Sequence, residues 1–412
     1  MAKSKLRSYA DGRKAFGTDG NLVIPEIGSM EIRVSEHWGH TPTLDLLSRD
    51  ICLDLSAYDM QDVNFDVNTK FSDLTKCPKG WNKRNEILEL GKDPGLYIRS
   101  LHKKGIDGGG LSMAVIDQPL SDHVEYHDNL VHYEEFGYDK VTGSMHGSAV
   151  ASIAVGKTCG VAPNAKLYYF AANNKKIKNG QVIRTADYRI QALERILKIN
   201  ESLPDKDKIQ VVSISAGWMG SVNTEKSEEW KKVLEKVKKT GLFVLTTASR
   251  KEYGLGFNGL GKKVYGNPNQ TNSYLECPYN LPQSYIDRKN VFVLMDHRTT
   301  ASPTGKNDYF HLSDGGFSWA TPWLAAVFLL ARQVNPTVTP EHFWKLALKT
   351  GIFSPKVHGT IIQPVKLIKV LQKEMHSSNI KKIMATGQSR AIKRKNMKQN
   401  NLQIIKGEQN AK

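Results

Sequence analysis

Between residues 111 and 370 the chain alternates short apolar runs with longer runs of helical period, and this alternation constrains its fold more than any other feature. It predicts strands at 111–117, 165–172, 209–215, 242–249 and 290–297, and helices at 146–156, 185–200, 224–241, 318–335 and 339–351. The strand runs are apolar almost throughout, which is typical of a parallel sheet buried on both faces. We therefore predict an α/β fold in three layers, with a mostly parallel sheet covered by helices on both faces.

Two flanking segments lack this alternation. Residues 1–85 contain many turn residues and few clear periods, so we expect an N-terminal extension or a small appended domain before a main domain at 86–373. Residues 374–412 carry nine Lys or Arg against two acidic residues, and thus +7 of the formal net charge of +17. This composition predicts a basic, flexible C-terminal tail.

The basic charge raises the question of an acidic partner. A nucleic acid would bind through the tail, but no RNP, zinc-finger or basic-zipper pattern accompanies it, so we favour a plain solvated tail. The longest apolar run, 319–331, is shorter than the ~20 residues that span a bilayer and is interrupted by Thr321 and Pro322. We predict no membrane span.

The N-terminus and the cysteines both bear on the compartment. No apolar segment follows the basic first residues, so we predict no signal peptide and expect a cytoplasmic protein. Cys52, Cys77, Cys159 and Cys277 are scattered without a C-x-x-C pair. This spacing favours reduced thiols over a zinc site or a dense disulfide framework.

Three short segments carry the residue types of nucleophilic catalysis. MAVIDQP ends a predicted strand with Asp117, HGSAVAS begins a small-residue helix with His146, and GFSWATP begins an apolar helix near Ser318. A serine nucleophile needs an imidazole to take its proton and a carboxylate to orient the imidazole. We predict that Asp117, His146 and Ser318 form a catalytic triad. Alone, each has a plainer interpretation: a turn carboxylate, a surface histidine and an ordinary helix N-terminal serine.

The three segments resemble the signatures of the subtilisin-like serine protease family, the subtilases of peptidase family S8. HGSAVAS is similar to the family's H-G-T-H-V-A-G, and GFSWATP to its G-T-S-M-A-T-P. CGVAPNAKLY, VSISAG and GTIIQPVKLI resemble further family segments in the same order, so the resemblance spans roughly residues 85–372. It implies a subtilisin-like fold and a serine endopeptidase that hydrolyses a protein or peptide substrate through an acyl-enzyme. Calcium sites are common in the family, but no liganding loop can be matched, and we assign no metal residue and no certain cofactor.

The resemblance also implies the substrate-binding residues. Ser215, Ala216 and Gly217 match the strand that pairs with the substrate backbone. Ser249 stands where the family has Gly and would narrow the first specificity pocket.

The oxyanion hole departs from the family pattern, because the usual Asn is replaced by Arg250. Either the Arg250 guanidinium donates, or Asn258 takes the place, or the hole is incomplete and activity is low. The backbone N–H of Ser318 is expected to contribute in each case. The alternative function is therefore a catalytically weak subtilase-fold protein that binds a peptide or a partner.

Two other patterns are set aside. GLGFNG and GFNGLGKK, within residues 254–263, partly fit nucleotide-binding motifs, but no helix follows, and we expect a glycine-rich surface loop. Residues 121–135 contain three His without an H-E-x-x-H pattern, and we expect a surface loop there rather than a metal site.

Overall fold

A five-stranded sheet forms the centre of the computed structural model, which describes residues 5–11, 43–216, 225–277 and 290–377. Its strand order is β11 (Phe243–Thr246), β10 (Ile209–Ile214), β5 (Ser112–Asp117), β7 (Lys166–Ala172) and β6 (Leu130–Phe136). Neighbouring strands are parallel throughout, with Val115 of β5 opposite Ser213 on one side and Tyr169 on the other. The predicted parallel sheet is confirmed.

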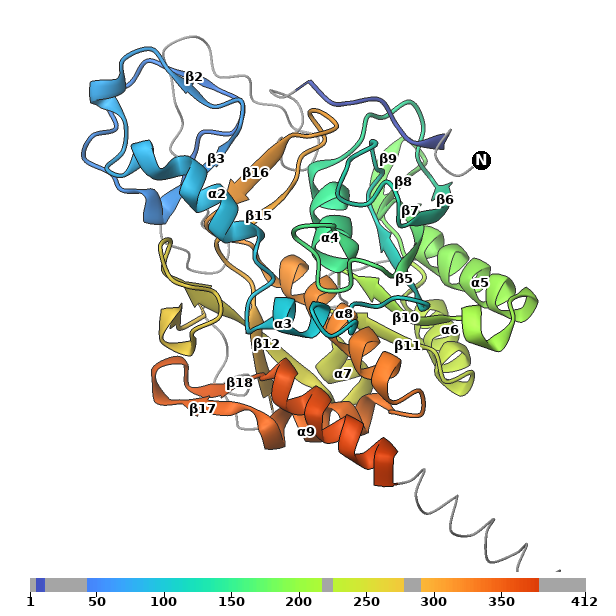
Figure 1. Cartoon of the computed structure of the whole chain (residues 1–412). Coiled ribbons are helices and arrows are strands. Elements are labelled where there is room, and N and C mark those ends of the chain that lie inside the picture. The colour runs from blue at the N-terminus through green and yellow to red at the C-terminus, as the bar shows by residue number, and fades with distance from the viewer. Residues whose placement is uncertain (1–4, 12–42, 217–224, 278–289, 378–412) are drawn as a thin grey trace, which may run out of the picture.

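Helices cover both faces of this sheet (Figure 1). One face packs against α4 (Met145–Val155) and α8 (Phe317–Val334), and the other against α5 (Asp187–Ser202) and α6 (Ser227–Lys239). Alternate residues of β5 enter the two layers, because successive side chains of a strand point to opposite faces. Met113 and Val115 belong to the core with α4 and α8, and Ala114 and Ile116 to the core with α5 and α6. This arrangement confirms the three-layer α/β fold.

A second sheet adjoins α8. Its order is β13 (Tyr274–Leu275), β12 (Gly256–Lys262), β14 (Asn290–Leu294), β18 (Gly359–Ile361) and β17 (Ile352–Ser354), with parallel inner pairs and antiparallel outer pairs. The short helix α7 (Ser249–Tyr253) packs on β12, and α9 (Pro340–Thr350) packs on β14. Since α8 contacts both sheets, it is apolar on nearly all sides, as a fully enclosed helix must be.

The glycine-rich segment that we expected to be a surface loop is instead strand β12, and all seven of its residues are buried. Its glycines allow the neighbouring chain to approach. A Cβ at Gly259 would lie 2.2 Å from Met295 Sδ, and one at Gly261 would lie 2.5 Å from the Glu276 carbonyl oxygen. The prediction was wrong because close packing, and not a turn, requires these glycines.

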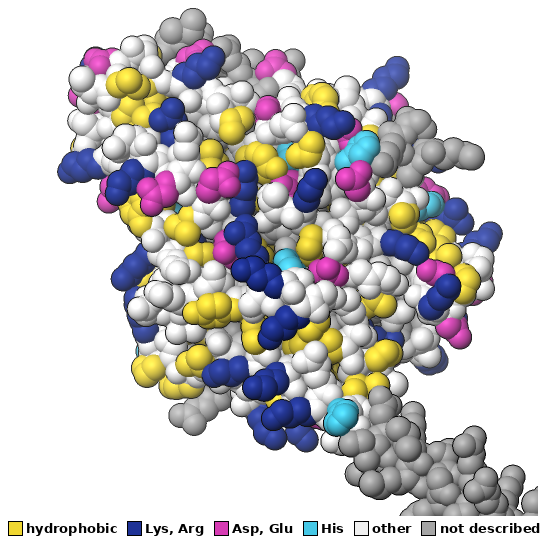
Figure 2. All heavy atoms as spheres, viewed as in Figure 1, with side chains coloured by type: hydrophobic (Ala, Val, Ile, Leu, Met, Phe, Trp, Pro, Cys, Tyr) yellow, Lys and Arg dark blue, Asp and Glu magenta, His cyan; other side chains and the backbone are white. Residues whose placement is uncertain are grey.

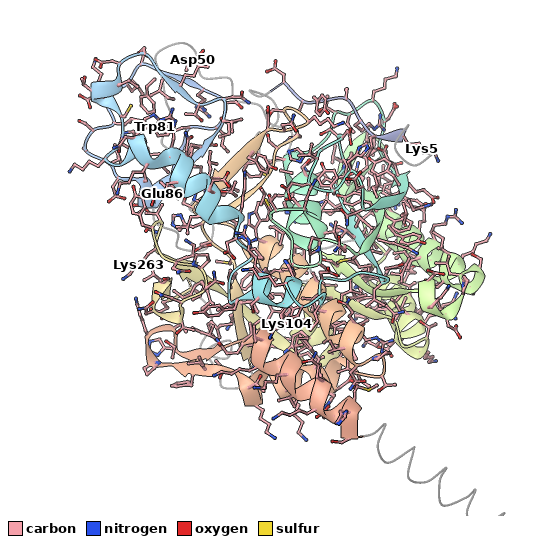
Figure 3. All side chains as sticks on the ribbon, viewed as in Figure 1. Lys5, Asp50, Trp81, Glu86, Lys104 and Lys263 are labelled. Atoms are coloured by element: carbon pink, nitrogen blue, oxygen red, sulfur yellow. The ribbon has the colours of Figure 1, made fainter. Side chains whose placement is uncertain are left out.

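The N-terminal region shares a sheet with the later chain. β1 (Leu44–Asp45) and β3 (Val63–Asp66) join β16 (Tyr309–Leu312) and β15 (Arg298–Ala301), and α2 (Arg84–Lys92) packs on β15 and β16. The small pair β2 (Asp50–Ile51) and β4 (Lys70–Phe71) completes this region. Its own hydrophobic core contains Trp81, which is labelled in Figure 3. The predicted boundary at residue 85 falls inside α2.

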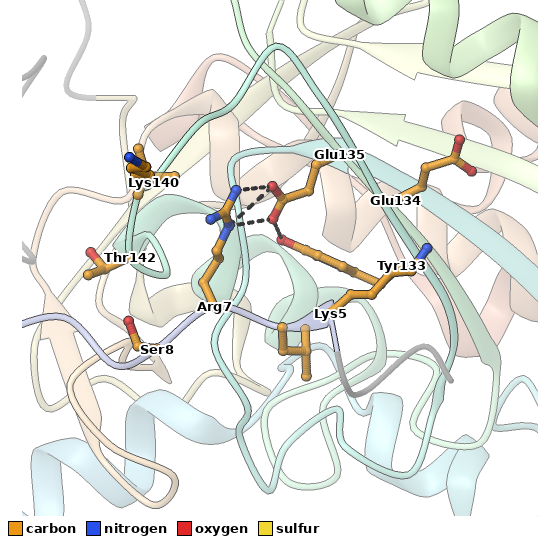
Figure 4. Close-up of a pocket in the computed structure, with 10 residues that line it drawn as sticks. Lys5, Arg7, Ser8, Tyr133, Glu134, Glu135, Lys140 and Thr142 are labelled. Carbon is orange, nitrogen blue, oxygen red and sulfur yellow. Dashed lines mark hydrogen bonds and ion pairs between the residues drawn. The ribbon is translucent and has the colours of Figure 1, made fainter.

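Three further segments complete the described chain. Residues 5–11 lie across the loop that follows β5, and Figure 4 labels Arg7 and Ser8 of this segment. The Arg7 N–H donates to the Leu120 carbonyl at 2.8 Å, and the Gly143 N–H donates to the Ser8 carbonyl at 3.0 Å. α3 (Ile98–His102) precedes β5, and the hairpin β8 (Lys175–Lys178) and β9 (Gln181–Arg184) precedes α5. A last helix runs from 364 through 377, so the predicted tail lies outside the described residues from 378 onward. No described helix has the length and apolar character needed to span a membrane.

Candidate active site

Asp117 and His146 are brought into contact at the carboxyl edge of the central sheet. Asp117 is the last residue of β5 and its side chain is 5% exposed, while His146 lies in the first turn of α4. Asp117 Oδ1 lies 2.6 Å from His146 Nδ1. A carboxylate at Nδ1 holds the proton on that nitrogen and leaves Nε2 free to accept one.

The glycine after His146 lets α4 approach the end of β5. A Cβ at Gly147 would lie 2.4 Å from the Gln118 carbonyl oxygen and 2.7 Å from the Tyr169 hydroxyl. That hydroxyl donates to the Gln118 carbonyl at 2.5 Å. The His-Gly pair of the motif therefore has a steric reason: no other residue allows this approach of helix to strand.

The pKa of His146 is raised above its ordinary value of 6.5. Burial acts in the opposite direction and is the largest single influence, but the charge of Asp117 and the hydrogen bond to it outweigh burial. The positive charge of Arg189 also lowers the pKa of this imidazole. The net effect is that the pair favours the imidazolium that a base forms when it accepts a proton.

Ser318 lies in the first turn of α8. Gly316, two residues earlier, has φ of 70° and ψ of 170°, a backbone conformation that is essentially restricted to glycine. Ser318 Oγ donates to the Ser215 carbonyl at 3.4 Å, and Ser215 Oγ donates to the Ser318 carbonyl at 2.8 Å. Among the described residues, Ser318 Oγ makes no hydrogen bond to His146.

Trp319 connects the two halves of the site. The ring of His146 packs edge-on against the Trp319 ring, with centroids 5.5 Å apart. The structure thus joins Asp117 to His146 and places Ser318 one residue from the ring that touches His146. The Ser318 hydroxyl itself faces Ser215.

The predicted oxyanion hole could draw on backbone donors at the start of α8. The first N–H groups of an α-helix have no acceptor within the helix, and Gly316 offers no side chain to cap them. The N–H of Ser318 is one of this first turn. Arg250 lies in α7 with its side-chain stem toward β12, since a Cβ at Gly256 would be 3.7 Å from Arg250 Cδ. Asn258 is fully buried in β12. Their roles as oxyanion donors stay predictions.

The predicted substrate-binding residues lie in different settings. Ser215 and Ala216 directly follow β10, and the Ala216 carbonyl accepts a hydrogen bond from the Thr247 N–H at 3.2 Å. Gly217 lies outside the described residues. Ser249 is 1% exposed and its hydroxyl donates to the Leu255 carbonyl at 2.7 Å, so the hydroxyl is engaged within the protein. Substrate binding by these residues stays a prediction.

The expected surface loop at 121–135 is wrong, because the segment ends in strand β6 and its first part, although a loop, buries His123, Glu125 and Tyr126. Each histidine has a partner of its own: Asp308 O for His123, Asp122 for His127 and Glu134 for His132. In the part of the chain that the structure describes, no three His, Cys, Asp or Glu side chains come together as a metal site. The four cysteines are free.

Sequence reasoning missed Arg189, the third residue of α5. Its charge acts on both Asp117 and His146, although it is more than 40 positions away from His146 in the sequence. An Arg in an amphipathic helix looks like an ordinary solvated residue. Only the packing of α5 against β5 and β7 brings it to the site.

The fold and the site together define a three-layer α/β protein with a buried Asp–His pair at the carboxyl edge of its central sheet. Residues 95–286 match the model Peptidase_S8, described as the subtilase family, and this match confirms the resemblance to subtilisin-like serine proteases. The matched residues include Asp117 and His146 but end before Ser318.

Several solved structures are similar to this chain. The prenylagaramide maturation protease PagA is 15% identical with a TM-score of 0.49, over 67% of this chain and 98% of that one. The A-subunit of the AB5 toxin from E. coli is 15% identical with a TM-score of 0.46, over 66% and 96% of the two chains. A cold-adapted subtilisin-like serine proteinase is 18% identical with a TM-score of 0.43, over 62% and 89%.

Proposed function

We propose that the chain is a serine endopeptidase in which Asp117, His146 and Ser318 act as a catalytic triad. The observation that carries the proposal is the 2.6 Å contact between Asp117 Oδ1 and His146 Nδ1. A carboxylate that is nearly fully buried and bonded to the inner nitrogen of a histidine orients the outer nitrogen as a base. The serine at the first turn of α8 is the nucleophile that such a base requires.

The proposed reaction begins when Ser318 Oγ leaves the Ser215 carbonyl and donates to His146 Nε2. Oγ attacks the scissile carbonyl carbon as its proton passes to Nε2, and the carbonyl oxygen becomes an oxyanion that first-turn N–H groups of α8 stabilise. The imidazolium gives the proton to the departing amine, which leaves an acyl-enzyme at Ser318. Water, deprotonated by His146, then releases the acyl group and restores the serine.

Hydrolysis of a fluorogenic protein substrate tests this function. We expect cleavage by the wild type and loss of about 10³-fold or more in kcat/KM in Ser318→Ala and His146→Ala, because triad members act as one unit. Ser202→Ala, which removes an exposed hydroxyl on α5, is the matched control and should keep full activity. Equal cleavage by the wild type and Ser318→Ala would overturn the proposal.

A second function is favoured by one observation, the hydrogen bond from Ser318 Oγ to Ser215 rather than to His146. A protein that keeps this arrangement would bind a peptide or a partner without cleaving it. Peptide binding by a well-folded wild type that hydrolyses no substrate would support this function.

The remaining expectations concern location and further ligands. A cytoplasmic location and a family-type calcium requirement stay predictions from the sequence. Figure 2 shows Lys and Arg side chains spread over the whole visible face. The sequence assigns any nucleic-acid binding to the basic tail, and a steep loss of binding with added salt would support it.

A further inference from the structure

The first turn of α5 lies at the same edge of the sheet as the Asp117–His146 pair. β7 runs beside β5 with Ala171 opposite Asp117, and the chain then forms the hairpin β8–β9 before α5. The Thr185 N–H donates to the Asn174 carbonyl at 2.9 Å, which ties the start of α5 back to the end of β7. Arg189, only four residues after Thr185, is therefore held near this edge.

The charge of Arg189 acts on the groups of the site. Burial lowers the pKa of Arg189, and the negative charge of Asp117 opposes that effect. In turn, Arg189 lowers the pKa of His146 and also acts to lower that of Tyr138, although burial dominates there. Arg189 is half-buried in the first turn of α5, and its charge interacts with those of Asp117 and His146.

Arg189 makes no hydrogen bond or ion pair with any other residue that the structure describes, whereas its neighbours on α5 are paired. Asp187 accepts from Lys176 Nζ at 2.6 Å, and Arg195 donates to Glu134 at 2.8 Å. Asp117, the acid whose charge it feels, is already bonded to His146. A half-buried cation loses part of its hydration, and a hydrogen-bond acceptor that carries negative charge offsets that loss most strongly.

We propose that Arg189 binds a carboxylate side chain of the peptide substrate beside the Asp117–His146 pair, so that acidic peptides are preferred. This inference rests on the proposed function, because it assumes that a peptide binds beside His146 and Ser318. A guanidinium binds a carboxylate through two parallel N–H···O hydrogen bonds, which gives selectivity against the neutral amide.

Equilibrium binding of synthetic peptides to Ser318→Ala tests the inference without any need for turnover. Peptides would carry Glu or Asp at successive positions, each beside its Gln or Asn counterpart. A hydrogen-bonded charged group contributes about 1.5–3 kcal/mol, so we expect the best acidic peptide to bind roughly 10- to 100-fold more tightly than its amide. Adding Arg189→Met should remove this difference.

The control variant is Lys198→Met, which removes an exposed cation from the same helix and should leave the acidic preference intact. Near-ultraviolet circular dichroism would show that Arg189→Met is folded. Equal binding of acidic and amide peptides, a preference that survives Arg189→Met, or no binding of any acidic peptide at millimolar concentration would each overturn the inference.

The same set of measurements separates the two proposals. An acidic preference that requires Arg189, in a wild type that cleaves nothing, would support the inference and contradict the endopeptidase. Cleavage by the wild type without an acidic preference would support the endopeptidase and contradict the role of Arg189.

Discussion

Ser318 and Ser215 exchange hydrogen bonds: each hydroxyl donates to the carbonyl oxygen of the other residue, at 3.4 Å from Ser318 and 2.8 Å from Ser215. The exchange joins the end of β10 to the first turn of α8. Only the longer of the two bonds must break for Ser318 Oγ to reach His146. The shorter bond can then keep the start of α8 in place during the reaction.

Removal of the Ser215 hydroxyl should therefore weaken catalysis without abolishing it. A neutral hydrogen bond contributes about 1 kcal/mol, so we expect Ser215→Ala to lower kcat/KM roughly fivefold. Ser215→Thr keeps the hydroxyl and should retain most of the activity. Both variants can be compared by their kcat/KM for one fluorogenic peptide. An equal loss of kcat/KM in Ser215→Ala and Ser215→Thr would show that the hydroxyl does not contribute.

The pH dependence of kcat/KM should report the raised pKa of His146. The base must be unprotonated, so activity falls as the pH drops through that pKa, and the acid limb should lie above 6.5. Asp117→Asn removes the influences that raise the pKa, whereas burial and Arg189 still lower it. The limb should then move to lower pH while kcat falls by roughly 10⁴.

Arg189→Met should shift the acid limb in the opposite direction from Asp117→Asn, because it removes a charge that lowers the pKa of His146. Its acid limb should move to higher pH. A full pH–rate profile of each variant provides the measurement. If the acid limbs of Asp117→Asn and Arg189→Met moved in the same direction, the electrostatic account of the site would be contradicted.

Asp296 holds the backbone just before the proposed nucleophile. Its side chain is 6% exposed, and Oδ1 accepts a hydrogen bond from the Gly315 N–H at 3.1 Å. Burial raises the pKa of this carboxyl well above its usual value, so a neutral amide is a close substitute. Asp296→Asn should change little, whereas Asp296→Ala leaves the N–H without its partner and should lower stability by about 1–3 kcal/mol. Urea unfolding of the two variants tests this, and equal stability of Asp296→Asn and Asp296→Ala would show that the hydrogen bond to Gly315 is not stabilising.

Arg7 should stabilise the loop between Asp117 and His146 through Glu135. Its Nε lies 2.9 Å from Glu135 Oε1, in an open pocket shown in Figure 4. Because the two side chains are 25% and 17% exposed, we expect Arg7→Gln to lower stability by only about 1–2 kcal/mol.

Lys140→Gln is the control for Arg7. Lys140 lines the same pocket but has no ion pair with a described residue, so its replacement should not shift the melting temperature. A larger loss of stability in Lys140→Gln than in Arg7→Gln would contradict the stabilising contact between Arg7 and Glu135.

The sequence predicted the elements whose periodicity is strong. β5 and α8 begin and end within one residue of their expected bounds, because one is apolar throughout and the other is enclosed on nearly all sides. β12 was missed because its glycines imitate a turn, and β15 and β16 because their polar residues are buried by contact with the distant N-terminal region.

The site was predicted only in part for a similar reason. The motifs placed Asp117 and His146 at strand and helix ends, and the parallel sheet then brings them together. The direction of the Ser318 hydroxyl and the approach of Arg189 depend on side-chain rotation and on helix packing. Neither leaves a period or a motif in the sequence.

The most direct test of the central claim is fluorophosphonate labelling of the purified wild type, read by intact mass beside Ser318→Ala. An activated serine nucleophile should give one adduct on the wild type and none on the variant. Absence of an adduct on well-folded wild type, or equal labelling of Ser318→Ala, would contradict the assignment of Ser318 as the nucleophile.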